Sequence, residues 1–135
     1  YKSEADLVGK TAVVESGSAG QSYADGAVGD SGKVIKAAAQ INTFTEVKSG
    51  AADFAVVDII LAQNVCGKGN YDDLCIVNAI ELESEIYAIG FRRGSDLTAK
   101  VNEAIKTLRD NGKLLEIAKK YGLENSLSVQ ETINY

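Results

Sequence analysis

Residues 53–58 read DFAVVD, and they indicate the architecture more directly than any other segment of the chain. Four consecutive apolar residues between two acidic ones are typical of a strand that is covered on both faces, as in a parallel sheet. We therefore predict a central strand at 54–57. Asp58 follows at once and is a residue type that caps helix N-termini, which predicts a helix from Ile59 to about Val65.

Strands and helices alternate on both sides of this segment. Upstream, apolar periodicity and glycine positions predict a strand at 11–15, a helix near 21–27, a strand at 33–38 and a helix ended by Gly50. Downstream they predict strands at 74–77 and 85–92, then two amphipathic helices ended by Gly112 and Gly122. This alternation favours an α/β fold with a mainly parallel sheet, followed by two carboxyl-terminal helices.

Composition excludes several classes of function. The 135 residues are 45% hydrophobic and 24% charged, which is typical of a globular chain, and no apolar run approaches the ~20 residues that span a bilayer. The formal charge is -5 and the basic residues are scattered, so nucleic acid is not an expected partner. Without histidine, the chain cannot supply a Ser-His-Asp triad or a histidine-ligated zinc. Because it also lacks methionine, we expect a processed protein or a piece of a longer one.

Two cysteines, Cys66 and Cys75, leave two interpretations open. They are too few for a structural zinc site, and their spacing is not that of a Cys-x-x-Cys redox motif. In an exported protein they could form a disulfide; otherwise they are two small buried thiols.

Two segments have the chemistry of a ligand site. The turn Gly17-Ser18-Ala19-Gly20 lies between a strand and a helix, where backbone N–H groups and the helix dipole favour an anion such as a carboxylate. Asp58 follows another strand and could hold an ammonium group. Each has a structural alternative, an ordinary turn for the first and a helix cap for Asp58. Together they suit a zwitterion, and a free amino acid is the simplest one.

Five segments resemble a known family. Residues 6–19, 47–58, 85–94, 101–112 and 117–122 are similar to the second lobe and closing helices of the polar-amino-acid solute-binding proteins of bacterial ABC importers, family 3. Tyr121 stands where the family often has a Trp-Phe pair. The resemblance implies a periplasmic-binding-protein-like type II lobe, a three-layer α/β/α structure with a mainly parallel sheet. It divides the chain into lobe two at 1–84, a crossing strand at 85–94, and a part of lobe one at 95–135.

The resemblance also implies roles for individual residues. Asp58 matches the aspartate that binds the ligand's α-ammonium, and backbone N–H groups around Gly17, Ser18 and Ala19 match those that help hold its α-carboxylate. Glu15 matches a position whose side chain can face the ligand's side chain. The implied protein is no enzyme, needs no cofactor or metal, and works outside the cytoplasm, in the periplasm or lipid-anchored on the outer face, with a membrane permease as partner.

An enzyme on the same fold is the alternative. A lyase of the cyclohexadienyl-dehydratase kind would need a general acid in the cleft, and Glu15 is the candidate.

The chain departs from the family pattern in one large respect. The amino-terminal portion of lobe one, with its ligand-clamping arginine, is not among the 135 residues. We therefore expect weak or undetectable binding of free amino acids by this chain. The apolar stripes of the closing helices would then dock on lobe two or exchange between two chains in a homodimer.

Overall fold

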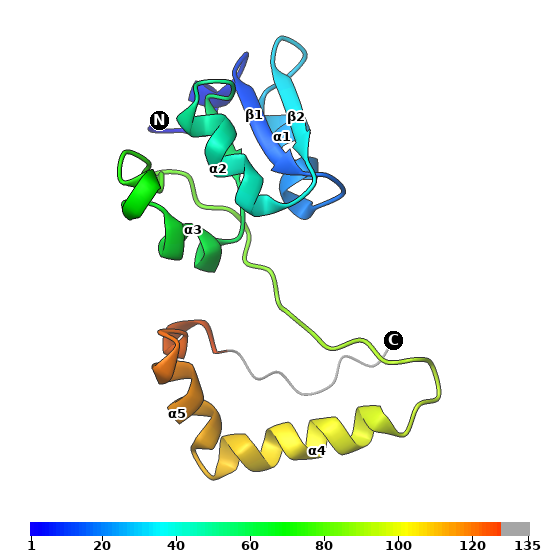
Figure 1. Ribbon diagram of the computed structural model, residues 1–135. Coiled ribbons are helices and arrows are strands. Elements are labelled where there is room, and N and C mark those ends of the chain that lie inside the picture. The colour runs from blue at the N-terminus through cyan, green and yellow to red at the C-terminus, as the bar shows by residue number, and fades with distance from the viewer. Residues whose placement is uncertain (128–135) are drawn as a thin grey trace. The chain divides into compact units, whose positions relative to one another are not determined.

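The computed structural model describes residues 1–127 and divides the chain into two units. The first unit is Tyr1–Leu82, and the second begins at Glu83 (Figure 1). The first contains a parallel sheet and its helices, and the second contains two helices that follow a segment without regular structure. The prediction of an α/β fold followed by two helices is confirmed.

The sheet has three strands, β1 (Thr11–Glu15), β2 (Lys33–Ala37) and β3 (Phe54–Val56). Their order is β2-β1-β3 and both pairs are parallel, as predicted. The prediction that 54–57 forms the central strand is wrong, because β1 lies between the other two. The three middle residues of β1 have no exposed surface, whereas β3 is only half-buried. An apolar run shows that a strand is covered, but it does not show which strands are its neighbours.

Three helices accompany the sheet, α1 (Ala19–Ala27), α2 (Gln40–Lys48) and α3 (Ile59–Val65), with 3-10 turns η1 (Glu4–Leu7) and η2 (Gly69–Tyr71). The connections from β1 to β2 and from β2 to β3 run in opposite directions along the sheet. Because such crossovers are right-handed, α1 and α2 flank opposite faces (Figure 1).

The core of this unit follows the alternation of side chains along β1. Ala12 and Val14 pack with Ala24 and Val28 of α1. The side chain of Val13 points to the other face of the sheet. Helix α2 packs on the sheet too, and it contributes the buried Phe44.

Two predicted strands are absent, since neither 74–77 nor 85–92 forms one. Residues 74–77 are in part half-buried beside α3, and 85–90 are exposed. A strand needs hydrogen bonds from a neighbouring strand, and no ladder bonds reach either segment. Alternation of apolar residues indicates that a segment suits a sheet, but the partner strand comes from elsewhere in the fold.

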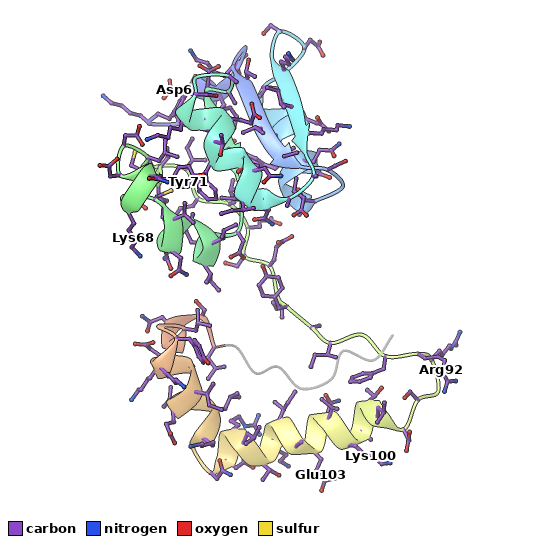
Figure 2. All side chains as sticks on the ribbon, viewed as in Figure 1. Asp6, Lys68, Tyr71, Arg92, Lys100 and Glu103 are labelled. Carbon is purple, nitrogen blue, oxygen red and sulfur yellow. The ribbon has the colours of Figure 1, made fainter. Side chains whose placement is uncertain are left out.

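The second unit contains α4 (Leu97–Asp110), α5 (Lys113–Lys120) and the turn η3 (Glu124–Ser126). Both predicted helices are confirmed, and Gly112 separates them at a φ of +77°, a left-handed conformation that favours glycine. No residue of α4 is buried, and its charged side chains Lys100 and Glu103 are exposed (Figure 2). The end of the predicted tail, 128–135, lies outside the described residues.

The apolar side chains of the two helices are largely exposed. Ala118 is the one buried residue of α5. Large apolar residues with exposed surface are Leu97, Leu108, Leu115, Ile117 and, directly after α5, Tyr121. Within residues 1–127, no helix combines the length and the apolar character that crossing a bilayer requires.

A pair of glycine substitutions tests the packing of the first unit. A Cβ at Gly32 would lie 2.3 Å from Val28 Cβ and 2.8 Å from the Lys10 carbonyl oxygen. We expect Gly32→Ala to lower the free energy of unfolding by about 2 kcal/mol, because the backbone around it must move. Gly26→Ala, inside α1 where no atom outside the local helix backbone lies within 4 Å of the added Cβ, should instead raise it by about 0.5 kcal/mol. Urea denaturation measures both, and equal effects of the two variants would contradict the packing.

Candidate functional site

The carboxyl ends of the three parallel strands lie at one edge of the sheet, and α1, α2 and α3 begin beside it (Figure 1). In a sheet with the order β2-β1-β3, the switch point lies between β1 and β3, which is where open α/β sheets bind ligands. All five residues singled out in the sequence follow or end these two strands. The fold therefore brings the predicted site residues to the same edge.

The first turn of α1 is built around Ser18, the N-cap residue. Its Oγ accepts a hydrogen bond from the Gln21 N–H at 3.1 Å and donates one to the Glu15 carbonyl oxygen at 2.8 Å. Gly17 stands just before it at a φ of +77°, and its N–H donates to Gln21 Oε1 at 2.9 Å. The Gly17 amide, one of those predicted to bind a ligand, is therefore bound by the Gln21 side chain. Sequence analysis did not identify Gln21 as a site residue.

The remaining amides of this turn belong to the start of the helix. The Ser18 N–H donates a long hydrogen bond of 3.3 Å to the Glu15 carbonyl oxygen. Ala19 and Gly20 are the first two helical residues, and N–H groups at these positions have no acceptor within the helix. Ala19 is exposed and Ser18 is half-buried, so the turn faces solvent. The positive end of the α1 helix dipole lies at this turn.

Asp58 has the capping role that the sequence predicted as one of its two alternatives. Its Oδ1 accepts hydrogen bonds from the N–H groups of Ile60 at 2.9 Å and Leu61 at 3.0 Å. The residue is half-buried. A carboxylate has about four acceptor positions, so capping is compatible with binding an ammonium as well.

Gln40 connects this position to α2. Its Oε1 accepts a hydrogen bond of 2.7 Å from the backbone N–H of Asp58. As the first residue of α2, Gln40 reaches from one strand end to another. Nothing in the local sequence signals this contact, because the two residues are separated by 18 positions.

Gly20 joins the first turn of α1 to the end of β3. A Cβ at Gly20 would lie 3.0 Å from the Val56 carbonyl oxygen and 3.2 Å from Val56 Cγ1. Val56 is the last residue of β3 and precedes Asp58 by two positions. The absence of a side chain at Gly20 therefore allows the start of α1 to approach the strand that leads to Asp58.

Glu15 completes the group as the last residue of β1. It is half-buried, pairs with Ala37 of β2, and accepts the Ser18 hydrogen bonds through its carbonyl oxygen. Its position between the ends of β2 and β3 places it at the middle of the edge.

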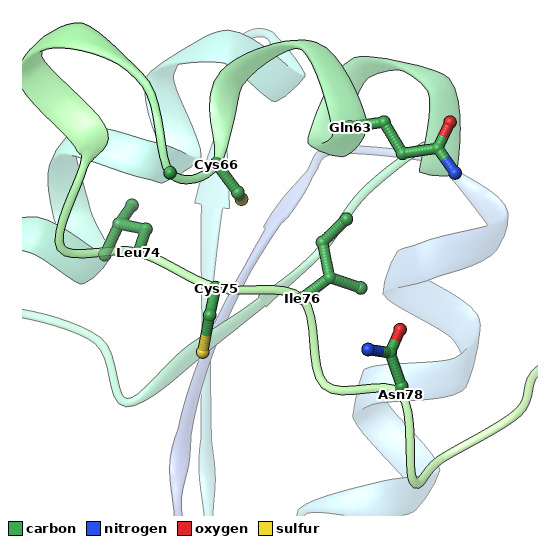
Figure 3. Close-up of a pocket in the computed structure, with 7 residues that line it drawn as sticks. Gln63, Cys66, Leu74, Cys75, Ile76 and Asn78 are labelled. Atoms are coloured by element: carbon green, nitrogen blue, oxygen red, sulfur yellow. The ribbon is translucent and has the colours of Figure 1, made fainter.

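A surface pocket of about 420 Å³ lies elsewhere in the first unit (Figure 3). It is lined by Gln63, Cys66, Gly67, Leu74, Cys75, Ile76 and Asn78. None of the five predicted site residues contributes to it. Across residues 1–127, no group of three or more histidine, cysteine, aspartate or glutamate side chains is arranged to hold a metal ion.

Both cysteines in this pocket are free thiols. Cys75 is exposed and Cys66 is only half-buried, so the interpretation of two buried thiols is wrong. Burial, together with the neighbouring Cys75, raises the pKa of the Cys66 thiol.

Helix N-termini gathered at the switch point of a parallel sheet are the arrangement with which open α/β folds bind small ligands. The arginine-binding extracellular protein ArtP of Bacillus subtilis (strain 168) is 38% identical to this chain over 78 residues. The match covers 56% of this chain and 30% of the relative's length. Over that part the chain is similar to a binding protein. No family model matches the chain, and no solved structure matches it significantly.

Proposed function

We propose that this chain is part of the substrate-binding subunit of a bacterial ABC importer for a polar amino acid. The observation that carries the proposal is the 38% identity to an arginine-binding extracellular protein. The proposed protein works outside the cytoplasm, carries out no covalent chemistry and uses no cofactor. Its fold is a type II lobe of the periplasmic-binding-protein kind.

The proposed ligand is held by its two charged groups. The α-carboxylate binds at the start of α1, where the dipole and the amides of Ser18 and Ala19 favour an anion. The α-ammonium binds to the Asp58 carboxylate through charge-assisted hydrogen bonds. These groups follow the neighbouring strands β1 and β3, and neighbouring strands lie about 4.8 Å apart, a separation that one small zwitterion can span.

The proposed selectivity is for a polar or cationic side chain. Glu15 ends the strand between the other two, at the edge that holds Ser18 and Asp58. A carboxylate there favours a cationic group on the ligand. The name of the relative points the same way, since it is arginine-binding.

The same proposal explains why this edge is open. In a two-lobed protein the second wall of the cleft comes from the other lobe, and closure of the lobes around the ligand is the change that a membrane permease would recognise. Exposed Gly17 and Ala19 are consistent with a surface that another lobe covers.

The helices α4 and α5 are proposed to belong to that other lobe. Their large apolar side chains are exposed in this chain, which is unusual for helices with an apolar stripe. We propose that, in a preparation of these 135 residues alone, two copies of the chain exchange these helices in a homodimer. Sedimentation at increasing concentration should then show dimers, and a monomer at all concentrations would argue against exchange.

The experiment that tests the function is a ligand screen on the longer polypeptide that contains this chain. We expect calorimetry to detect tight binding of arginine or another polar amino acid, with the amino acid recovered unchanged. If the polypeptide instead converts a cyclohexadienyl substrate, and Glu15→Gln abolishes the conversion, the lyase is the correct function. Binding of no amino acid would also overturn the proposal.

A further inference from the structure

We propose that Cys66 and Cys75 are a redox pair that forms a reversible intramolecular disulfide, closing the loop between them and joining the segment after η2 to the end of α3. This modification site is separate from the proposed ligand edge, and it does not depend on amino-acid binding.

The two cysteines line the same pocket, from opposite ends of one loop (Figure 3). Cys66 is the C-cap residue of α3, and its N–H donates to the Ala62 carbonyl oxygen at 2.8 Å. Cys75 lies nine positions later, in a segment that belongs to no helix or strand. Cys66 is held by the end of α3, whereas Cys75 lies outside any helix or strand. We therefore expect Cys75 to change its conformation when the disulfide forms.

The loop between the cysteines is already closed by hydrogen bonds. The carbonyl oxygen of Tyr71 accepts from the Gly67 N–H at 2.9 Å and from the Leu74 N–H at 3.1 Å. Gly67 directly follows Cys66, and Leu74 directly precedes Cys75. A single acceptor thus draws the chain neighbours of both cysteines to one point, which is why we propose that the two cysteines can be linked without unfolding the loop.

Contacts with α2 hold this loop in place. The rings of Phe44 and Tyr71 pack with centroids 5.7 Å apart, and Tyr71 Oη and Thr45 Oγ1 form a hydrogen bond of 3.1 Å. Lys48 Nζ lies 2.9 Å from Asp73 Oδ1. Figure 2 shows the position of Tyr71, the last residue of η2. An ordered loop loses less conformational freedom when its ends are linked.

The proposed disulfide requires the Cys75 side chain to turn toward Cys66. In Figure 3 the sulfur of Cys75 points away from Cys66. Cys75 is exposed, so its side chain can turn about the Cα–Cβ bond to another staggered position.

The oxidant that the proposal names is a low-molecular-weight disulfide, such as oxidised glutathione. The thiolate of Cys75, the exposed partner, attacks one sulfur of that molecule, forms a mixed disulfide and releases one thiol. Cys66 then gives up its proton, attacks the Cys75 sulfur and releases the second thiol. The two protein thiols are oxidised and the small disulfide is reduced to two thiols. Because burial raises the pKa of Cys66, it suits the second step better than the first.

Peptide mapping tests the bond directly. The chain is equilibrated in glutathione buffers from fully reduced to fully oxidised, alkylated to block free thiols, and digested with trypsin without reduction. Lys68 is the tryptic site between the cysteines, so a disulfide keeps peptides 49–68 and 69–92 joined. We expect the joined pair in monomeric protein under oxidising conditions, and its loss on reduction. Glutathione adducts on both cysteines, or a bond only between two chains, would overturn the proposal.

Thermal unfolding provides a second measurement with a matched control. Linking residues about ten positions apart should raise the melting temperature of the first unit by about 10 °C between the reduced and oxidised forms. Cys75→Ser changes an exposed side chain, should fold, and should show no such shift. Equal melting temperatures for the two redox forms of the unsubstituted chain would also overturn the proposal, whereas failure of amino-acid binding would leave it intact.

Discussion

Asp58→Asn is expected to weaken amino-acid binding about 100-fold or more in the longer polypeptide that contains this chain. The substitution removes the charge that we propose to hold the α-ammonium. Asparagine is as good an N-cap as aspartate, so the cap on the Ile60 and Leu61 amides is retained. The free energy of unfolding should therefore change by less than about 0.5 kcal/mol. Calorimetry measures the affinity and urea denaturation measures the stability.

Two further variants separate ligand binding from helix capping. Asp58→Ala removes both functions and should cost about 1 kcal/mol of stability besides the loss of affinity. Asp72→Asn removes an exposed carboxylate in the same unit and should change neither quantity. If Asp58→Asn binds as tightly as the unsubstituted protein, Asp58 is a helix cap alone and the proposed ammonium site is wrong.

This chain by itself is expected to bind any amino acid at least about 1000-fold more weakly than the longer polypeptide does. A ligand pocket normally encloses most of its ligand, and the edge that carries Ser18 and Asp58 forms only one side of such an enclosure. Water remains at the charged groups, so their attraction for the ligand is screened. Calorimetry with arginine and a panel of other amino acids measures the difference.

A folded first unit is the control for this comparison. Hydrogen exchange should show protected amides in β1, the most buried strand, before any binding experiment is interpreted. A micromolar dissociation constant for any amino acid with this chain would refute the prediction, because it would mean that a single lobe is sufficient.

The helices and strands that were predicted correctly have local causes. Ser49 and Gly50 end α2 because Gly50 adopts a φ of +78°. Asp58 begins α3 because its side chain accepts hydrogen bonds from the Ile60 and Leu61 amides. Such signals lie within a few residues of the element they define. Such elements can therefore be predicted from a single sequence.

The errors about strands all concern partners distant in the chain. The run at 54–57 was predicted to be central, yet β1 takes that place. Segments 74–77 and 85–92 have residues suited to strands, but no neighbouring strand pairs with them. Strand pairing depends on which segments lie side by side, and the packing of the whole unit determines this.

The site shows the same division. The sequence alone identified Ser18 and Asp58 as polar residues that follow strands, and it identified the capping chemistry of Asp58, whereas the N-cap role of Ser18 came from the structure. The bond from the Gly17 N–H to Gln21 Oε1 is local and was missed, whereas only the tertiary structure revealed that Gln40 binds the Asp58 backbone, 18 positions away. The tertiary structure also revealed the close approach of Gly20 to Val56. The physical reason is range: capping and turn formation act over three or four residues, whereas the edge of a parallel sheet is assembled from strand ends that are tens of residues apart.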